Sequence, residues 1–356
     1  MFQHLRSGCN ITPMLYAYHK SPKNILAMLP KYEIASDSLP LVKFDTNFTY
    51  DKYCELKKIV YDEMHEQKIP VYWTAGETLY NLSALFVYAS TWGYCFYNSN
   101  NFSYGWILLL AFMSTTICNL IFHETSHYTG SNNKTLNRCL SYCAYPFMVE
   151  SNWKFTHNYL HHSFTNTNYD CDYSLPHQLI RHSLQQPHQW FHTYQQLYTS
   201  FLFMLFTYHI GINISWKHSK LNWVCFPLML YYFGLGKTIC WYSLSGFLFT
   251  LIAQLSHVQH ECIECNTEQK NDFLCNQVVS AMNYRTNDPI TRLLCFGLDI
   301  QIEHHLFPNI PHSSLRRIQP IVRAYCDKHN IPYVEKSSVF PMLYSYVSYL
   351  GSMAKP

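Results

Sequence analysis

The sequence predicts an all-α membrane protein with four transmembrane helices in two hairpins and a cytosolic helical cap that holds a histidine-rich metal centre. Residues 78–122 contain no Asp, Glu, Lys, Arg or His, and residues 221–256 contain a single charge, Lys237. A helix needs about 20 apolar residues to cross a bilayer, so each stretch is long enough for a hairpin. Three histidine clusters flank these stretches. The net charge of +3 gives no support to nucleic-acid binding.

The first hairpin is expected to run through residues 78–96, to turn at 98–101 and to return through 104–122. The 76 residues that precede it contain nine Lys or Arg, whereas the turn contains none. Positively charged segments tend to stay in the cytosol. We therefore expect the amino terminus and the first histidine cluster on the cytosolic side.

Three apolar segments separate the second and third histidine clusters. If all clusters serve one centre, an even number of these segments must cross the membrane. Residues 197–216 precede Lys217 and Lys220, so we expect this segment to lie along the membrane surface. Residues 222–236 and 239–256 then form the second hairpin.

The cytosolic cap is expected to contain two soluble helices, one near the amino terminus and one near the carboxy terminus of the sequence. Residues 1–76 would form a cytosolic amino-terminal segment with an amphipathic helix at 44–68, residues 77–335 the membrane domain, and residues 336–356 a carboxy-terminal tail. Helical spacing predicts that the first helix buries one face, made of Tyr53, Leu56, Ile59, Val60 and Met64. A second helix after Pro311 would bury Leu315, Ile318, Ile321, Val322 and Tyr325.

The three histidine clusters have the spacing of metal ligands on helices. Residues four apart lie on one face of a helix, one turn apart, and imidazole binds iron, zinc and copper well. A single zinc ion takes three or four ligands, so the set indicates more than one ion. Ligation by nitrogen without carboxylates suits iron that must be oxidised and still remain bound. The predicted ligands are His123, His127, His157, His161, His162, Gln301, His304 and His305.

The same spacing predicts how the ligands are divided. His157 and His161 are expected on one helix face, with His162 about 100° further round, toward a second metal ion. The third cluster is expected to share one face, from which Glu303 points away.

Residues near the clusters add candidates of two kinds. His257 lies at the cytosolic end of the last span, where an ionisable group is costly and usually functional, and His260 follows one turn later. A metal-bound histidine usually donates its other N–H to a carboxylate or carbonyl, and Asp170 and Asp172 follow the second cluster closely enough for that role. Further candidates for such outer contacts are Glu124, Asp299 and His312.

The clusters resemble the three histidine boxes of the membrane fatty acyl desaturases, in the family's order and with similar separations. The glutamine that opens the third box resembles the front-end branch, which places a new double bond between an existing one and the carboxyl end. The segment QIEHHLFP from Gln301, followed by IPH and by YCDKHNIPY from Tyr325, is similar to that branch, and Asn137-Arg138 and HHSFTN from His161 resemble its linoleoyl-CoA (Δ6-type) members. The resemblance covers residues 70–335.

The resemblance implies a mushroom-shaped fold of four spans whose cap holds two iron ions, with His257 as a ligand from the fourth span. It implies a reaction that uses two electrons and O2 to remove hydrogen from two adjacent methylenes, which leaves a cis alkene and water. The acyl chain would lie in a bent apolar tunnel. Many front-end members have Asp in the first box where this chain has Glu124, a difference that leaves the ligands intact.

Electrons are expected from a separate protein. The 76 residues before the first span contain no His-Pro-Gly-Gly motif, which a fused cytochrome b5 would carry. The expected donor is cytochrome b5 with its reductase, or a ferredoxin, and it would dock near Arg316, Arg317 and Arg323.

The sequence leaves the substrate and some alternatives open. The substrate carrier could be coenzyme A or a membrane lipid. The same centre could hydroxylate, form acetylenic bonds or desaturate sphingolipids, although sphingolipid members usually open the third box with His. A membrane zinc hydrolase would leave most of the histidines unexplained, and a non-catalytic lipid-binding homologue would be expected to lack some of them. The expected location is the endoplasmic reticulum membrane in a eukaryote, or the cytoplasmic membrane in a bacterium, with the active site facing the cytosol.

Overall fold

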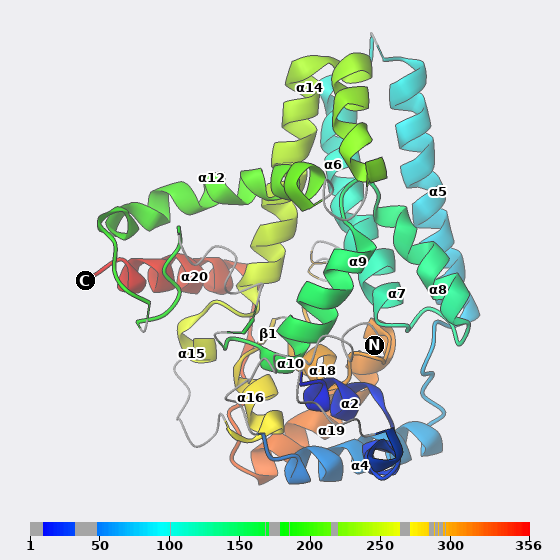
Figure 1. The fold of residues 1–356 in the computed structure, drawn as a ribbon, viewed down its shortest axis with the longest axis vertical. Helices are drawn as coiled ribbons and strands as arrows, with labels where there is room; N and C mark the ends of the chain where they lie inside the picture. Colours follow the sequence, from blue (N-terminus) through cyan, green and yellow to red (C-terminus); the bar gives the residue numbers. More distant parts are fainter. Residues whose placement is uncertain are drawn as a thin grey trace.

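The computed structural model is mostly helical, and its long helices have two main orientations (Figure 1). Helices α5, α6 and α14 run along the long axis, whereas α12, α20, α4 and α19 run across it. The structure describes residues 10–32, 48–99, 101–167, 169–170, 179–184, 186–214, 220–263, 271–284, 288, 291, 295 and 297–356.

Helices α5 (Ala75–Tyr97) and α6 (Tyr104–Ile117) lie where the sequence predicts the first hairpin. Helix α5 begins at a capping box, in which the Thr74 hydroxyl accepts the backbone N–H of the third helical residue. Helix α6 continues without a break into the π-helix η2 (Cys118–His123) and the short α7 (Glu124–Ser126). The end of this long helix carries the first histidine cluster.

Helix α14 (Lys220–Leu255) contains the second hairpin. Gly234 has φ 76° and ψ 168°, a conformation that glycine adopts readily, and the chain reverses there. The two halves lie side by side (Figure 1), and the rings of Phe226 and Tyr242 pack 5.2 Å apart between them. Among the described residues, two stretches are long and apolar enough to cross a membrane, namely Tyr104–Ser126 and Trp223–Leu255, the second of which includes this reversal.

Helix α12 (Gln195–Tyr208), which η6 (His209–Ile214) extends, crosses α14 at close range. A Cβ atom at Gly246 would lie 2.8 Å from the carbonyl oxygen of Phe203, so glycine permits this crossing. Figure 1 shows α12 running crosswise to α14, the orientation that the sequence predicts for a helix on the membrane surface.

The last residues of the chain, for which the sequence predicts only a tail, form helix α20 (Val339–Met353). It packs beside α12, where the Gln195 side chain donates a hydrogen bond of 2.7 Å to the carbonyl of Leu350. Its apolar face is therefore part of a core shared with α12 and α14.

The cap is built around α4 (Asp51–Glu66), α16 (Phe273–Val279), α18 (Gln301–Leu306) and α19 (His312–Lys328). Helix α19 buries Leu315, Ile318, Val322 and Tyr325 as predicted, with Ile321 half-buried. The prediction for α4 is partly wrong: Ile59 is exposed, and the buried face includes Lys57 and Tyr61 instead. The predicted residues 44–47 lie outside the described residues.

The remaining elements are short and connect these parts. Strands β1 (Asn283–Tyr284) and β2 (Glu335–Lys336) pair in parallel. The short helices are α2 (Thr12–Tyr18), α3 (Pro22–Leu26), η1 (Leu29–Tyr32), α8 (Lys134–Ser141), η3 (Tyr142–Ala144), α9 (Glu150–Trp153), η4 (Lys154–His161), α10 (His162–Phe164), η5 (Trp190–Tyr194) and α15 (His260–Ile263).

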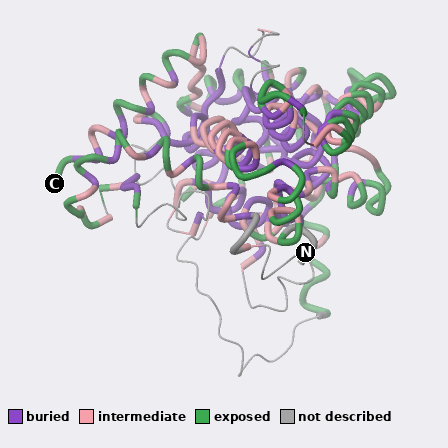
Figure 2. The backbone as a smooth tube through the Cα atoms, turned by 90° about the horizontal axis from the view of Figure 1, so that it is seen from above, coloured by how far each residue is buried: buried purple, intermediate pink, exposed green. Residues whose placement is uncertain are grey.

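Figure 2 shows buried residues concentrated in the middle of the molecule and exposed residues on the outer helices. On α5, which faces outward, large apolar side chains are exposed, among them Leu79, Phe86 and Tyr97. Exposed apolar surface of this kind marks contacts with a membrane or with another protein.

Candidate metal centre

The first and second histidine clusters lie on π-helical turns. His123 is the last residue of η2, and His157 and His161 lie within η4. A π-helix is hydrogen-bonded between residues five apart, and such turns are frequent at functional sites. The clusters are thus carried by distorted continuations of regular helices rather than by loops.

The π-helix corrects the predicted orientation of the second cluster. Residues five apart come into register, so His162 lies next to His157, with 3.2 Å between their Nε2 atoms. The rings of His157 and His161 stack at 5.1 Å, but His161 also lies 4.8 Å from the rings of His257 and His305. His157 and His161 thus lie side by side but fall into different groups of potential ligands.

The third cluster forms helix α18, which buried polar contacts hold in the cap. Glu303 accepts hydrogen bonds of 2.7 Å from both the Asn283 amide and the Tyr333 hydroxyl. The Asn283 side chain also accepts the backbone N–H of Ile302. Glu303 thus faces away from the histidines, as predicted, and fixes the rotation of α18 about its axis.

The structure brings eight histidines together in two groups. In each group, the nitrogen atoms that could bind a metal lie within 4.8 Å of one another. The five-histidine group consists of His123, His127, His157, His162 and His304, and the three-histidine group of His161, His257 and His305.

Each pair of adjacent histidines is divided between the groups. His161 and His305 belong to the three-histidine group, whereas His162 and His304 belong to the five-histidine group. Consecutive residues of a helix point about 100° apart, so an adjacent pair can serve two ions that lie side by side. The paired histidines in the sequence were the signal for this division.

The side chains fit metal ions better than they fit one another. Nε2 of His127, Nε2 of His305 and both ring nitrogens of His304 are buried and have no hydrogen-bond partner among the described residues. Buried polar atoms are rarely left unpaired. Burial lowers the pKa of His127, His304 and His305 well below the usual value of histidine, and the neighbouring imidazoles lower it further. The rings are therefore neutral, the form that binds metals.

The outer nitrogens of the three-histidine group are all held by acceptors. Nδ1 of His161 lies 3.0 Å from a carboxylate oxygen of Asp170, and Nδ1 of His257 lies 2.9 Å from the carbonyl of Ser280. Nδ1 of His305 lies 3.1 Å from Oε1 of Gln277. Each ring therefore turns Nε2 toward the group.

Asp170 occupies the outer position that the sequence proposed. Burial raises the pKa of Asp170, but the His161 ring and the Asn166 N–H lower it more, so the carboxylate is charged. Asp172 lies outside the described residues.

The other candidates are in different surroundings. Asp299 binds the guanidinium of Arg316 through two hydrogen bonds, of 2.6 and 2.8 Å, and therefore supports the cap. Glu124 accepts hydrogen bonds from the Trp73 ring and, at 2.6 Å, from the backbone of His312, whose ring lies 5.5 Å from that of His123.

Gln301 lies beside His257 and lines the same cavity as it. The ring of His260 packs edge to face on Tyr349, 5.1 Å away, and is in neither histidine group.

Two of the three arginines predicted to dock an electron donor are paired with carboxylates, which weakens that prediction. Arg316 is engaged by Asp299, and Arg323 pairs with Glu335 at 3.0 Å. The third arginine, Arg317, donates a hydrogen bond to the backbone carbonyl of Gln67, and among the described residues it has no carboxylate partner.

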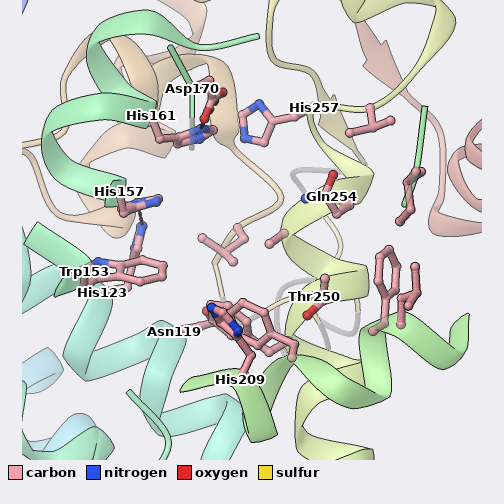
Figure 3. A pocket seen from close by; sticks show the side chains of 18 of the residues that line it. Asn119, His123, Trp153, His157, His161, Asp170, His209, Thr250, Gln254 and His257 are labelled. Carbon is pink, nitrogen blue, oxygen red and sulfur yellow. Dashed lines mark hydrogen bonds and ion pairs between the residues drawn. The ribbon is translucent and has the colours of Figure 1, made fainter. Parts of the chain in front are cut away.

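A cavity of about 300 Å³ opens beside the centre between η2, η4, α12 and α14 (Figure 3). His157, His161 and His257 line one end, and Asn119, His209 and Thr250 lie at the other. Most of the remaining wall is apolar and includes Trp153, Ile180, Leu202, Phe203, Leu205, Phe206 and Phe249. Such a cavity suits a long apolar ligand.

Sequence reasoning missed three residues of this site. Tyr18 contacts His127 from helix α2, Gln277 holds His305 from α16, and Asn283 orients α18. All three lie far along the chain from the rings that they orient, so no local motif could have indicated them.

Comparison with known proteins is consistent with this site. The model of the fatty acid desaturase family matches residues 100–337. The chain is 26% identical to an sn-1 linoleoyl-lipid 6-desaturase of Synechocystis over 279 residues, which cover 65% of this chain and 75% of the relative. It is 22% identical to the Delta(5) fatty acid desaturase A of Dictyostelium discoideum over 408 aligned positions, which cover 98% and 84%. An acyl-lipid (8-3)-desaturase of Physcomitrium patens is 28% identical over 235 residues, which cover 56% and 49%.

The chain belongs to the fatty acid desaturase family, which confirms the resemblance seen in its histidine boxes. It is accordingly an oxidoreductase that acts on fatty acyl chains.

Proposed function

We propose that this desaturase is a front-end enzyme, which inserts a cis double bond between an existing double bond and the carboxyl end of an unsaturated acyl chain, at a Δ6 or Δ5 position. The observation that carries the proposal is the pair of buried, neutral histidine groups next to an apolar cavity. The glutamine at the start of the third box and the Δ6 and Δ5 activities in the names of the relatives support the position.

The two histidine groups would each hold one iron ion. The five-histidine group would bind one ion through His123, His127, His157, His162 and His304, and the three-histidine group the other through His161, His257 and His305, with Gln301 beside it. Two bound irons would supply the redox chemistry that reduces O2 to water while two hydrogens leave adjacent methylenes. Eight imidazoles in two groups exceed what one hydrolytic zinc would need.

The protein would position the acyl chain and exclude water. The wall of the cavity would hold the chain next to the ring of Trp153, which stacks on His157 at 4.1 Å. His161 and His257 lie at the end of the cavity nearest the cap. A chain in the cavity would thus present its methylenes to the centre while its remainder stays in an apolar environment.

The membrane arrangement is part of the same proposal. Helix α5 with α6, and the two halves of α14, would form four spans, with α12 on the membrane surface and the cap in the cytosol. A separate donor, cytochrome b5 with its reductase or a ferredoxin, would deliver electrons to the cap. The membrane would be the endoplasmic reticulum in a eukaryote or the cytoplasmic membrane in a bacterium.

The test is the fatty acid profile of yeast that express the chain and are fed linoleic and α-linolenic acids, with His304→Ala as the control. We expect a new product whose added double bond lies nearer the carboxyl end, and no such product with the variant. Purified protein should contain two iron ions. Protein that holds zinc instead, or a product hydroxylated rather than desaturated, would overturn the proposal.

A further inference from the structure

Helix α2 lies outside the residues that match the family model, yet it packs against the turn that carries the second histidine cluster. Ile11 and Leu15 share an apolar cluster with Leu160 and Phe164. The hydroxyl of Tyr159 donates a hydrogen bond of 3.0 Å to the carbonyl of Asn10. Since Tyr159 and Leu160 lie between the ligands His157 and His161, α2 and these ligands are parts of one packed unit.

The end of α2 is also fixed from the cap. The buried Lys57 of α4 donates hydrogen bonds to the carbonyls of Tyr16 and Ala17, at 2.5 and 3.1 Å. The Asn309 amide donates to the carbonyl of Tyr18 at 3.3 Å. These contacts determine where the Tyr18 side chain points.

The Tyr18 hydroxyl lies 2.5 Å from Nδ1 of His127, and the two rings are nearly parallel. Nε2 of the same ring is buried and without a partner among the described residues. A nitrogen that binds a metal carries no hydrogen, so with Nε2 bound, Nδ1 must carry the hydrogen and needs an acceptor.

The neighbouring amide of Asn158 cannot serve as that acceptor. Its nitrogen, not its oxygen, lies 3.5 Å from Nδ1 of His127. The amide is fixed in this orientation, because its nitrogen donates to the carbonyl of Ser126 and its oxygen accepts from the Ser126 hydroxyl. The phenol oxygen of Tyr18 is therefore the acceptor that the described residues provide.

We propose that Tyr18 is a positioning residue of the metal centre: it accepts Nδ1–H of His127 and thereby directs Nε2 of that ring into the five-histidine group. This inference rests on the proposed iron centre and deepens it. The amino-terminal segment, which carries no histidine box, becomes part of the metal site.

Tyr18→Phe tests the inference, with Tyr16→Phe as the matched control. Both variants remove a phenol oxygen from α2, but the Tyr16 ring stacks on Tyr50 at 3.8 Å, away from the histidine groups, and among the described residues its hydroxyl has no hydrogen bond to a histidine of either group. The full-length protein, purified in detergent, would be loaded with iron and compared by iron release to a chelator and by Mössbauer spectroscopy.

We expect Tyr18→Phe to release one of its two iron ions about tenfold faster, the lower end of the effect of outer contacts on metal affinity. One Mössbauer doublet should shift, while Tyr16→Phe should match the wild type. Equal release rates and unchanged spectra for Tyr18→Phe would overturn the inference.

A second variant covers the case in which Tyr18→Phe does not fold. Monofluorotyrosine at position 18 keeps the ring shape and a phenol that is protonated at neutral pH, but it makes the phenol oxygen a weaker acceptor, so release should be faster by a smaller factor. Unchanged release would again contradict the inference. Wild-type protein that binds no iron would instead refute the proposed function, so the two failures are distinguishable.

Discussion

The two histidine groups differ in how the protein holds their rings. In the three-histidine group every Nδ1 has an acceptor, namely Asp170, the Ser280 carbonyl or Gln277. In the five-histidine group, Nδ1 of His123, His162 and His304 has no partner among the described residues. Tyr18, from the other end of the chain, contacts Nδ1 of His127.

The difference indicates two ways of orienting ligands. The three-histidine group relies on specific hydrogen bonds from residues inside the family match, one of them charged. The five-histidine group relies on the packing of π-helical turns and on one hydroxyl from outside that match. We therefore expect the two iron sites to respond differently to changes in their surroundings.

The largest effect is expected from replacing either of the two adjacent histidines of the second box. His161→Ala and His162→Ala should each lower desaturation at least about 100-fold, since each removes a ligand from a different ion. Mössbauer spectra of the two purified variants should lose different doublets. If both variants lost the same doublet, the division of the pair between the groups would be wrong.

Asp170→Asn should weaken the three-histidine group next most strongly. The amide keeps the shape of the side chain but removes the charge that holds His161, and outer contacts of this kind contribute about 10- to 100-fold to metal affinity. Iron content after dialysis against a chelator measures the effect. Asp327→Asn, on the exposed face of α19, is the control and should retain both ions.

Gln277→Leu should act on the same group with a smaller effect, about tenfold or less. The variant removes a neutral acceptor from His305, while Thr165 still lies 3.2 Å from the same Nδ1. The rate of iron release would show the effect, and a release as fast as that of Asp170→Asn would contradict the ranking of charged over neutral acceptors.

The smallest expected effect is on the free energy of unfolding, and it comes from the titration of Lys57, which binds the end of α2. Burial lowers the pKa of Lys57 to about 7, below its value in the unfolded chain. The unfolded chain therefore holds more protons above about pH 7, and the free energy of unfolding should rise with pH from about 7 to 8.5, by at most about 1.4 kcal/mol per pH unit. Thermal unfolding of Lys57→Met should lack this rise. If the free energy of unfolding rose equally with pH in the variant and the wild type, Lys57 would be excluded as the cause of the rise.

Several features of the fold and the site could be predicted from the sequence alone. The nearly uncharged stretches predicted the helices of both hairpins, because apolar segments of this length usually form long helices that cross a membrane or are buried in a core. Helical periodicity gave α19 with nearly its whole buried face. Asp170 could be proposed as a partner of a ligand because it lies nine residues from His161.

The errors share a cause. Lys57 belongs by residue type to the polar face of α4, but it is buried because its ammonium donates to two backbone carbonyls of α2. Arg316 resembles a free surface charge until Asp299 is placed beside it. Each outcome depended on a partner distant in sequence.

The sequence by itself determined the eight imidazoles, their helical spacing and the apolar helices that bring them to one place. The tertiary structure decided which imidazoles lie together in each group, in part through the π-helical turns that carry His123, His157 and His161. It also decided which contact fixes each ring, as for Tyr18 on His127 and Gln277 on His305. The physical reason is that the direction of a side chain depends on local helix geometry and on partners from distant segments, whereas residue type and spacing are local properties of the chain.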